Sequence, residues 1–148
     1  MAGLSSKLQS CFCGRVNKNR ALAFSQCCGS YLDHFDTRPA PDAESLMRSR
    51  YSAFVLERGA YLKQTWLSAH CPPDISFEPD AKWLGLEVKW SRTTGPEQAE
   101  VEFVARSRLK GVPTRLHELS RFVKAEGRWF YVDGTLSLIH ISEPTRPY

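Results

Sequence analysis

Cys11-Phe12-Cys13-Gly14 and Gln26-Cys27-Cys28-Gly29 are two short stretches that together hold four of the chain's five cysteines. Four thiols so close in sequence are what a tetrahedral zinc site requires, because zinc takes four soft or borderline ligands and binds thiolates well. The glycine after each cysteine pair lets the backbone turn toward the sulfurs without a Cβ clash. Four protein ligands leave no open coordination position, so the sequence predicts one structural zinc ion held by Cys11, Cys13, Cys27 and Cys28.

The cysteine pairs are also compatible with disulfide bonds, or with four buried thiols unrelated to one another. Residues 1–10 carry one lysine and no long apolar run, so nothing there resembles a signal peptide. We therefore expect a cytoplasmic protein in a reducing compartment, where disulfides do not persist. His34 can replace one sulfur but is more typical of a solvated loop, and we interpret Cys71 as a free thiol in a turn.

Length and composition indicate one ordinary domain with a small additional module. The chain has 148 residues, of which 42% are hydrophobic and 24% charged. No apolar run is long enough to span a membrane, so we expect no membrane partner. The formal net charge is +4, and the basic side chains near the cysteines are Lys7, Arg15, Lys18 and Arg20. They form either a solvated face or a contact with an acidic partner or RNA.

Two helices are predicted after the proline-containing linker at residues 37–41. Asp42 is a suitable N-cap, and Gly59 is placed to end the first helix. A second short helix is predicted at residues 60–66. The first helix has one apolar face, because its apolar side chains recur every three or four residues: Leu46, Met47, Tyr51, Phe54 and Val55.

The hydrophobic period then changes from that of helices to that of strands. Apolar residues alternate with polar or small ones at residues 84–90 and again at 101–105. Two further strands are predicted at 115–124 and 128–132, joined by a hairpin turn at Glu126-Gly127. Helices followed by a run of antiparallel strands indicate an α+β fold.

The cysteine stretches resemble the SEC-C zinc motif, a Cys-x-Cys…Cys-Cys pattern known from the C-terminus of SecA. All four ligand positions match the motif. The chain departs from it at Phe12, where proline is usual, and in a longer gap between the pairs. The additional polar residues 16–20 are predicted to bulge from the knuckle.

Later stretches resemble the YchJ family: LMRSRYSAFV at residues 46–55, WLGLEV at 83–88, ELSRFV at 118–123 and GRWFYVDG at 127–134. This resemblance implies a central domain similar to nuclear transport factor 2, in which a cone of helices packs on a curved antiparallel sheet. It divides the chain into a SEC-C-like zinc knuckle at 1–36, a linker at 37–41 and the α+β domain at 42–134. No activity comes with the family resemblance.

The remaining segment is interpreted as a non-native tail. LSLIHISEPTR at residues 136–146 resembles the in-frame translation of a transposase sequencing adaptor. Residues 135–148 are therefore left out of the fold prediction. Many family members carry a second SEC-C motif after the Asp-Gly pair that is Asp133-Gly134 here, so we expect that a second zinc site has been lost.

Curved sheets of this kind often enclose a pocket. Adjacent strand residues point to opposite faces, so His117 and Glu118 cannot act as a local acid–base pair. Arg48 and Arg50 diverge by about 200° on a helix, and we expect at least one to form a buried ion pair with a carboxylate such as Glu87, Glu118 or Asp133. We prefer this structural role to catalysis, and the chain has no phosphate loop, nucleophile elbow or metalloprotease helix. The candidate pocket or ion-pair residues are Arg48, Arg50, Glu87, His117, Glu118, Arg121, Tyr131 and Asp133.

Three functions remain in competition. The leading hypothesis is a zinc-binding accessory protein, not an enzyme, whose knuckle is a protein interaction surface. The resemblance supplies analogies for its partner, because the motif of SecA contacts the chaperone SecB and similar knuckles are associated with the ribosome. The second hypothesis is a small-molecule binder or enzyme that uses the central pocket. The third is RNA binding, with Phe12 or Phe24 stacking on bases.

Overall fold

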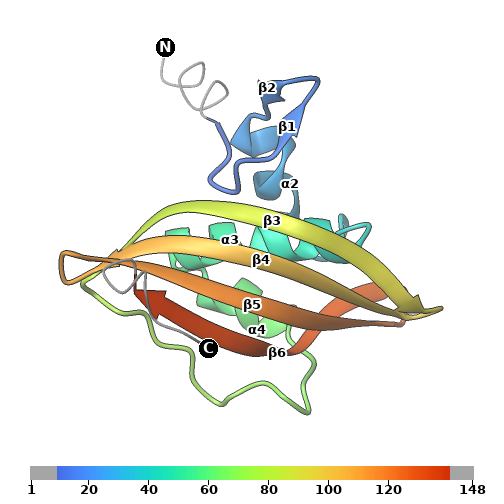
Figure 1. Cartoon of the computed structure of the whole chain (residues 1–148). Coiled ribbons are helices and arrows are strands. Elements are labelled where there is room, and N and C mark those ends of the chain that lie inside the picture. The colour runs from blue at the N-terminus through green and yellow to red at the C-terminus, as the bar shows by residue number, and fades with distance from the viewer. Residues whose placement is uncertain (1–9, 141–148) are drawn as a thin grey trace.

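The computed structural model describes residues 10–140, and for residues 136–140 the backbone alone. A small cysteine-containing knuckle lies above a larger layer of two helices and one arched sheet (Figure 1). The sheet has four antiparallel strands in the order β3-β4-β5-β6. The helices cover one face of the sheet and follow the knuckle in sequence. The predicted α+β fold with a curved antiparallel sheet is therefore confirmed. None of the described helices is long and apolar enough to cross a membrane.

The knuckle, residues 10–36, is a two-stranded hairpin followed by short helical turns. Strands β1 (Val16–Asn17) and β2 (Arg20–Ala21) are joined by Lys18 and Asn19, which both have positive φ. Two consecutive positive φ values give a tight turn whose twist suits a hairpin. The 3₁₀ helix η1 (Phe24–Gln26) and helix α2 (Cys28–Leu32) complete the knuckle. The insertion at 16–20 thus forms the projecting hairpin.

Helix α3 (Ala43–Leu56) begins where the sequence predicts. The Asp42 carboxylate accepts a 2.7 Å hydrogen bond from the backbone N–H of Ser45 and caps the helix. The prediction that Gly59 ends this helix is wrong, because Glu57 takes the left-handed conformation that terminates it. Gly59 instead begins helix α4 (Gly59–Gln64), which ends two residues before the predicted limit.

The four strands are longer than their alternating patterns suggest. They are β3 (Ala81–Gly95), β4 (Gln98–Leu109), β5 (Val112–Ala125) and β6 (Arg128–His140). Two-residue turns with positive φ, at Lys110-Gly111 and Glu126-Gly127, join the last three. The register between β3 and β4 shifts at three places, and such bulges bend and twist a strand. The sheet therefore arches over the helices.

Strand β6 continues into the segment interpreted as a non-native tail. Residues 136–140 pair with Thr114–Glu118 of β5, so their backbone completes the edge of the sheet. The adaptor-like origin of residues 135–148 stays a prediction, and residues 141–148 lie outside the described part of the chain. Residues 135–140, which the sequence indicates to be non-native, are thus part of strand β6 in the structure.

One continuous core connects the knuckle to the sheet. It runs from the four cysteines through α3 and α4 to β4 and β5. The edge of β6 is partly covered by the segment after α4, where Leu67 donates to the Tyr131 carbonyl and Tyr131 donates to the Thr65 carbonyl, both at 2.8 Å. Arg128 also donates to the carbonyls of Phe35 and Asp36, which fixes the last residues of the knuckle to β6.

Candidate metal site and central pocket

The four cysteines of the knuckle converge on one point. Their sulfur atoms all lie within 4.8 Å of one another, and the Sγ atoms of Cys13 and Cys27 are 3.6 Å apart. Zinc–sulfur bonds of about 2.3 Å in a tetrahedron place the sulfurs about 3.8 Å apart. Cys13 and Cys28 have no exposed surface, and none of the four forms a disulfide. The arrangement is therefore suited to a metal ion.

Two tight turns bring the cysteines together. Cys11 and Cys13 lie in the turn before β1, where the backbone N–H of Cys11 donates to the Leu22 carbonyl at 2.8 Å. Gly14 follows with a φ of +75°, which a residue with a side chain adopts only with strain. Cys27 caps α2 and Cys28 is its first residue. The backbone of the knuckle thus holds both pairs in place from opposite sides.

The thiols influence one another electrostatically. Hydrogen bonds with Cys13, Cys27 and Cys28 lower the pKa of Cys11 far below that of a free thiol. The pKa values of Cys27 and Cys28 are raised far above that of a free thiol, mainly by their contacts with Cys11 and Cys13. Charge on one sulfur therefore opposes charge on the next, and four thiolates need a cation among them. A four-sulfur donor set fits a soft-ligand metal such as zinc.

Helix α3 supports this cluster from below. The Ser52 hydroxyl lies 3.7 Å from the Sγ of Cys11, and Arg48 donates a 3.0 Å hydrogen bond to the Cys13 carbonyl. Arg48 also forms an ion pair with Glu44, one turn earlier in the helix, at 2.8 Å. One of the two arginines thus pairs with a carboxylate as expected, but its partner is Glu44 of the same helix and not Glu87, Glu118 or Asp133. This arginine joins the central domain to the knuckle and does not line the pocket.

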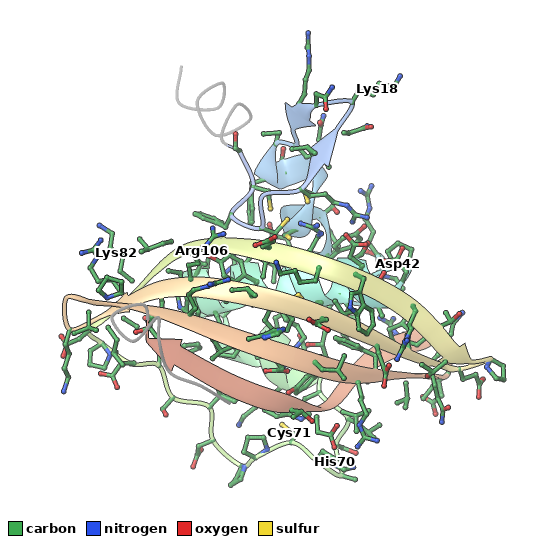
Figure 2. The ribbon with its side chains drawn as sticks, viewed as in Figure 1. Lys18, Asp42, His70, Cys71, Lys82 and Arg106 are labelled. Carbon is green, nitrogen blue, oxygen red and sulfur yellow. The ribbon has the colours of Figure 1, made fainter. Side chains whose placement is uncertain are left out.

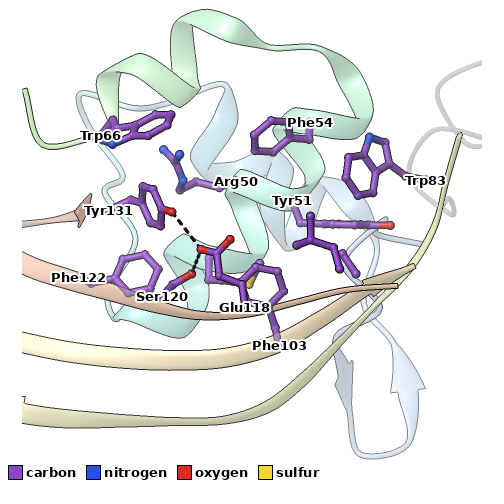
Figure 3. A pocket seen from close by; sticks show the side chains of 13 residues that line it. Arg50, Tyr51, Phe54, Trp66, Trp83, Phe103, Glu118, Ser120, Phe122 and Tyr131 are labelled. Carbon is purple, nitrogen blue, oxygen red and sulfur yellow. Dashed lines mark hydrogen bonds between the residues drawn. The ribbon is translucent and has the colours of Figure 1, made fainter. Parts of the chain in front are cut away.

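A separate cavity of about 210 Å³ lies between the helices and the concave face of the sheet. Figure 3 shows its wall from close by. Aromatic side chains from α3, the loop after α4 and the strands make up most of the wall: Tyr51, Phe54, Trp66, Trp83, Phe103 and Phe122. The other apolar lining residues are Met47, Ala105 and Leu116, and the polar ones are Arg50, Glu118, Ser120 and Tyr131.

Arg50 is buried against the end of α4. Its Nη1 donates to the Leu62 carbonyl at 2.8 Å and to the Thr65 hydroxyl at 2.7 Å. The guanidinium lies 4.5 Å from the ring centroid of Tyr131 and 5.0 Å from that of Trp66. Burial lowers the pKa of Arg50 to about 10, so the side chain stays charged at neutral pH. Among the described residues Arg50 forms no ion pair with a carboxylate, because carbonyl, hydroxyl and aromatic groups surround it instead.

Glu118 faces the cavity from the floor of the sheet. Its Oε2 accepts hydrogen bonds from the hydroxyl of Ser120 and, at 3.0 Å, from the hydroxyl of Tyr131 (Figure 3). Burial raises the pKa of Tyr131 above that of an exposed tyrosine, so this phenol remains a hydrogen-bond donor. The carboxylate rests against Gly134, where an added Cβ would come within 2.6 Å of Glu118 Cδ. A glycine in β6 therefore makes room for the acid.

The remaining candidates lie outside the cavity. His117 hydrogen-bonds to Glu102 at 2.8 Å, on the face of the sheet opposite to Glu118. Arg121 and Asp133 form an exposed ion pair, which lowers the pKa of Asp133. Glu87 pairs with two exposed bases, Lys89 and Arg106.

Three of the eight predicted pocket or ion-pair residues therefore line the cavity: Arg50, Glu118 and Tyr131.

Ser120 is a further polar residue of the cavity that is absent from the predicted site residues. Ser120 shares a strand face with Glu118, and that period of two is the signal that could have indicated its role. Trp66 and Trp83 also line the cavity, and no local sequence pattern separates them from ordinary core tryptophans. Of the described residues the metal cluster contains the four cysteines, so His34 lies outside it. Cys71 is half-buried and donates to the Pro72 carbonyl at 3.4 Å.

Comparison with known proteins gives consistent relatives in sequence and in structure. A UPF0225 protein of Polaromonas sp. (strain JS666 / ATCC BAA-500) is 60% identical over 126 residues, which cover 84% of this chain and 91% of the relative. A UPF0225 protein of Bordetella pertussis is 52% identical over 129 residues, covering 85% and 92%.

Two solved structures share the fold. The solution structure of a SEC-C motif containing protein from Rhodopseudomonas palustris has a TM-score of 0.74 and 32% identity, and the match covers 86% of this chain and 98% of that one. The crystal structure of a SEC-C motif containing protein from Psychrobacter arcticus also has a TM-score of 0.74, with 30% identity and coverage of 90% and 85%. Residues 42–134 match the family described as YchJ, middle NTF2-like domain. The chain therefore belongs to the YchJ family of UPF0225 proteins.

Proposed function

We propose that this protein is a zinc-binding accessory protein whose knuckle is a contact surface for an acidic protein partner. The observation that carries the proposal is the convergence of four buried sulfurs within 4.8 Å. Zinc at this point would be held by Cys11, Cys13, Cys27 and Cys28 as thiolates. Four protein ligands leave no position for substrate, so the ion would have a structural role. The similarity to two SEC-C motif containing proteins supports the same assignment.

Zinc content tests the metal assignment directly. We expect one zinc ion per chain in the purified protein, measured by elemental analysis, and none in the variant Cys27→Ser/Cys28→Ser. The variant Cys71→Ser is the matched control, because it removes a thiol outside the cluster and should keep the full zinc content. A wild-type chain that binds no zinc when all thiols are reduced would contradict the assignment.

The partner surface is the hairpin that projects from the knuckle. Val16, Lys18 and Arg20 are exposed there, and Val16 exposes 58% of its surface although it is apolar. Figure 2 shows Lys18 at the outer end of the hairpin, away from the sheet. Arg15 is less available, because it donates to the Ser45 hydroxyl at 2.9 Å. Lys7 lies outside the described residues.

A protein partner is favoured over RNA by the aromatic residues of the knuckle. Phe12 and Phe24, the two candidates for stacking on bases, are half-buried and pack edge to face with ring centroids 5.6 Å apart. The exposed hairpin offers two basic side chains and an apolar one. This combination suits an acidic protein surface with an apolar contact at its centre. The SecB-like and ribosomal partners suggested by motif analogy are candidates for this role.

Charge reversal at the hairpin tests the partner surface. We expect Lys18→Glu/Arg20→Glu to reduce capture of the partner at least tenfold in quantitative affinity purification from the source cell. The matched control is Lys82→Glu/Arg108→Glu, which changes the same residue types and the same net charge on exposed positions of the sheet. Lys82 lies at an end of the sheet, away from the hairpin (Figure 2). Equal loss in both variants would indicate a nonspecific charge effect, and loss in neither would contradict the surface.

A further inference from the structure

We propose that the cavity of the NTF2-like domain binds a small, flat, uncharged heteroaromatic molecule of one or two rings whose N–H group donates to Glu118. This site is distinct from the metal cluster and from the hairpin surface. The inference therefore does not depend on the proposed function.

The size and the wall of the cavity indicate an aromatic ligand. An apolar cavity of about 150 Å³ accepts a molecule the size of benzene, so a cavity of about 210 Å³ has room for a second fused ring. Tyr51 and Trp83 meet edge to face with centroids 5.8 Å apart, and Phe54 and Trp83 lie 6.1 Å apart. Ring edges and faces are thus both presented to a flat guest.

The acceptor in this cavity is the second oxygen of Glu118. Ser120 and Tyr131 both donate to Oε2, and among the described residues no donor reaches Oε1. Figure 3 shows this oxygen directed away from the two donors and into the aromatic space. A carboxylate oxygen beside apolar walls gains most from a hydrogen-bond donor, which a ligand N–H supplies.

Arg50 determines the charge of the ligand. Among the described residues, no nitrogen of Arg50 lies within 4.0 Å of a carboxylate oxygen of Glu118, so the two side chains form no ion pair. The positive charge of Arg50 nevertheless faces the same cavity and would repel a cationic guest. The Glu118 carboxylate would in turn repel an anion. A neutral molecule is repelled by neither group, and its N–H donor supplies the hydrogen bond that the Glu118 carboxylate accepts.

Two isomeric probes separate the hydrogen bond from simple apolar filling. 3-Methylindole keeps the N–H, whereas 1-methylindole has the same size and atoms but no N–H donor. We expect the full chain to bind 3-methylindole about tenfold more tightly than 1-methylindole, as measured by calorimetric titration. Equal affinity for the two isomers, or no binding of either to the folded chain at millimolar concentration, would overturn the proposal.

Two variants locate the effect. In Glu118→Gln the amide oxygen takes the place of Oε2 and its NH₂ faces the ligand, so the preference for 3-methylindole should disappear. In Ala105→Leu the added side chain occupies the cavity, so both probes should lose affinity while the chain still unfolds cooperatively. A preference that persists in Glu118→Gln contradicts the role of the carboxylate, whether or not Ala105→Leu folds.

Discussion

The position of the Glu118 side chain depends on the absence of a side chain at Gly134. Gly134 pairs with Ser120 across β5 and β6, and the Glu118 carboxylate occupies the space where a Cβ would stand. The acid can therefore reach Ser120 and Tyr131 at the same time. The position of the pocket carboxylate is thus fixed from the backbone of the neighbouring strand.

Gly134→Ala should destabilise the chain by about 1–3 kcal/mol, because its Cβ would displace the Glu118 carboxylate and disturb its two hydrogen bonds. Urea unfolding measures the free energy. Gly85→Ala is the matched control, since a Cβ there meets its nearest atom, Arg106 Nη1, at 3.9 Å. The control should change stability by less than about 1 kcal/mol, because its Cβ fits without displacing a neighbour. Both variants restrict the unfolded backbone equally, so the difference between them reports the displaced carboxylate. Equal effects in the two variants would mean that the carboxylate moves without cost.

The face of the sheet on which Glu118 lies can be predicted from the sequence, whereas the contacts of Arg48 and Arg50 cannot. Strand period alone places Glu118 and Ser120 on one side and His117 on the other. Helix period likewise separates Arg48 from Arg50, yet it carries no information on which distant atoms each side chain meets. Arg48 meets the Cys13 carbonyl and Arg50 meets the end of α4. Such contacts depend on how the elements pack, which no local pattern encodes.

At the scale of elements, Arg50 joins α3 to the end of α4. It donates to the Leu62 carbonyl and to the Thr65 hydroxyl, at the terminus where helix carbonyls lack partners and carry partial negative charge. The segment that follows pairs with Tyr131 of β6. One buried arginine therefore connects the two helices to the edge of the sheet.

Arg50→Met should destabilise the chain by about 2–4 kcal/mol, because two buried acceptors lose a charged donor. Thermal and urea unfolding report the change. Arg58→Met is the control, since Arg58 pairs with Asp33 at 3.1 Å and both side chains are about half exposed. Exposed ion pairs contribute less than about 1 kcal/mol, so this variant should remain close to the wild type. A cost as small for Arg50→Met as for Arg58→Met would show that water replaces the arginine.

At the scale of the whole molecule, one helix of the central domain, α3, contacts both the knuckle and the cavity. Ser52 and Arg48 of α3 contact the cysteine cluster, whereas Tyr51 and Arg50 of the same helix line the cavity. Cysteine spacing was enough to predict the cluster, and strand alternation was enough to predict the sheet. Their attachment to opposite sides of α3 could not be predicted, because it depends on tertiary packing across the linker.

Metal removal should therefore weaken the central domain as well as the knuckle. All four tryptophans lie within residues 42–134, so their fluorescence reports unfolding of the central domain alone. We expect a zinc chelator to lower this thermal transition by roughly 5–10 °C, because metal binding energy is folding energy and α3 transmits it. Cys27→Ser/Cys28→Ser should start at the lower value and not respond to the chelator. If chelation released the metal while the tryptophan transition stayed in place, the contacts of Ser52 and Arg48 with the cluster would carry no stability, and the two parts would fold independently.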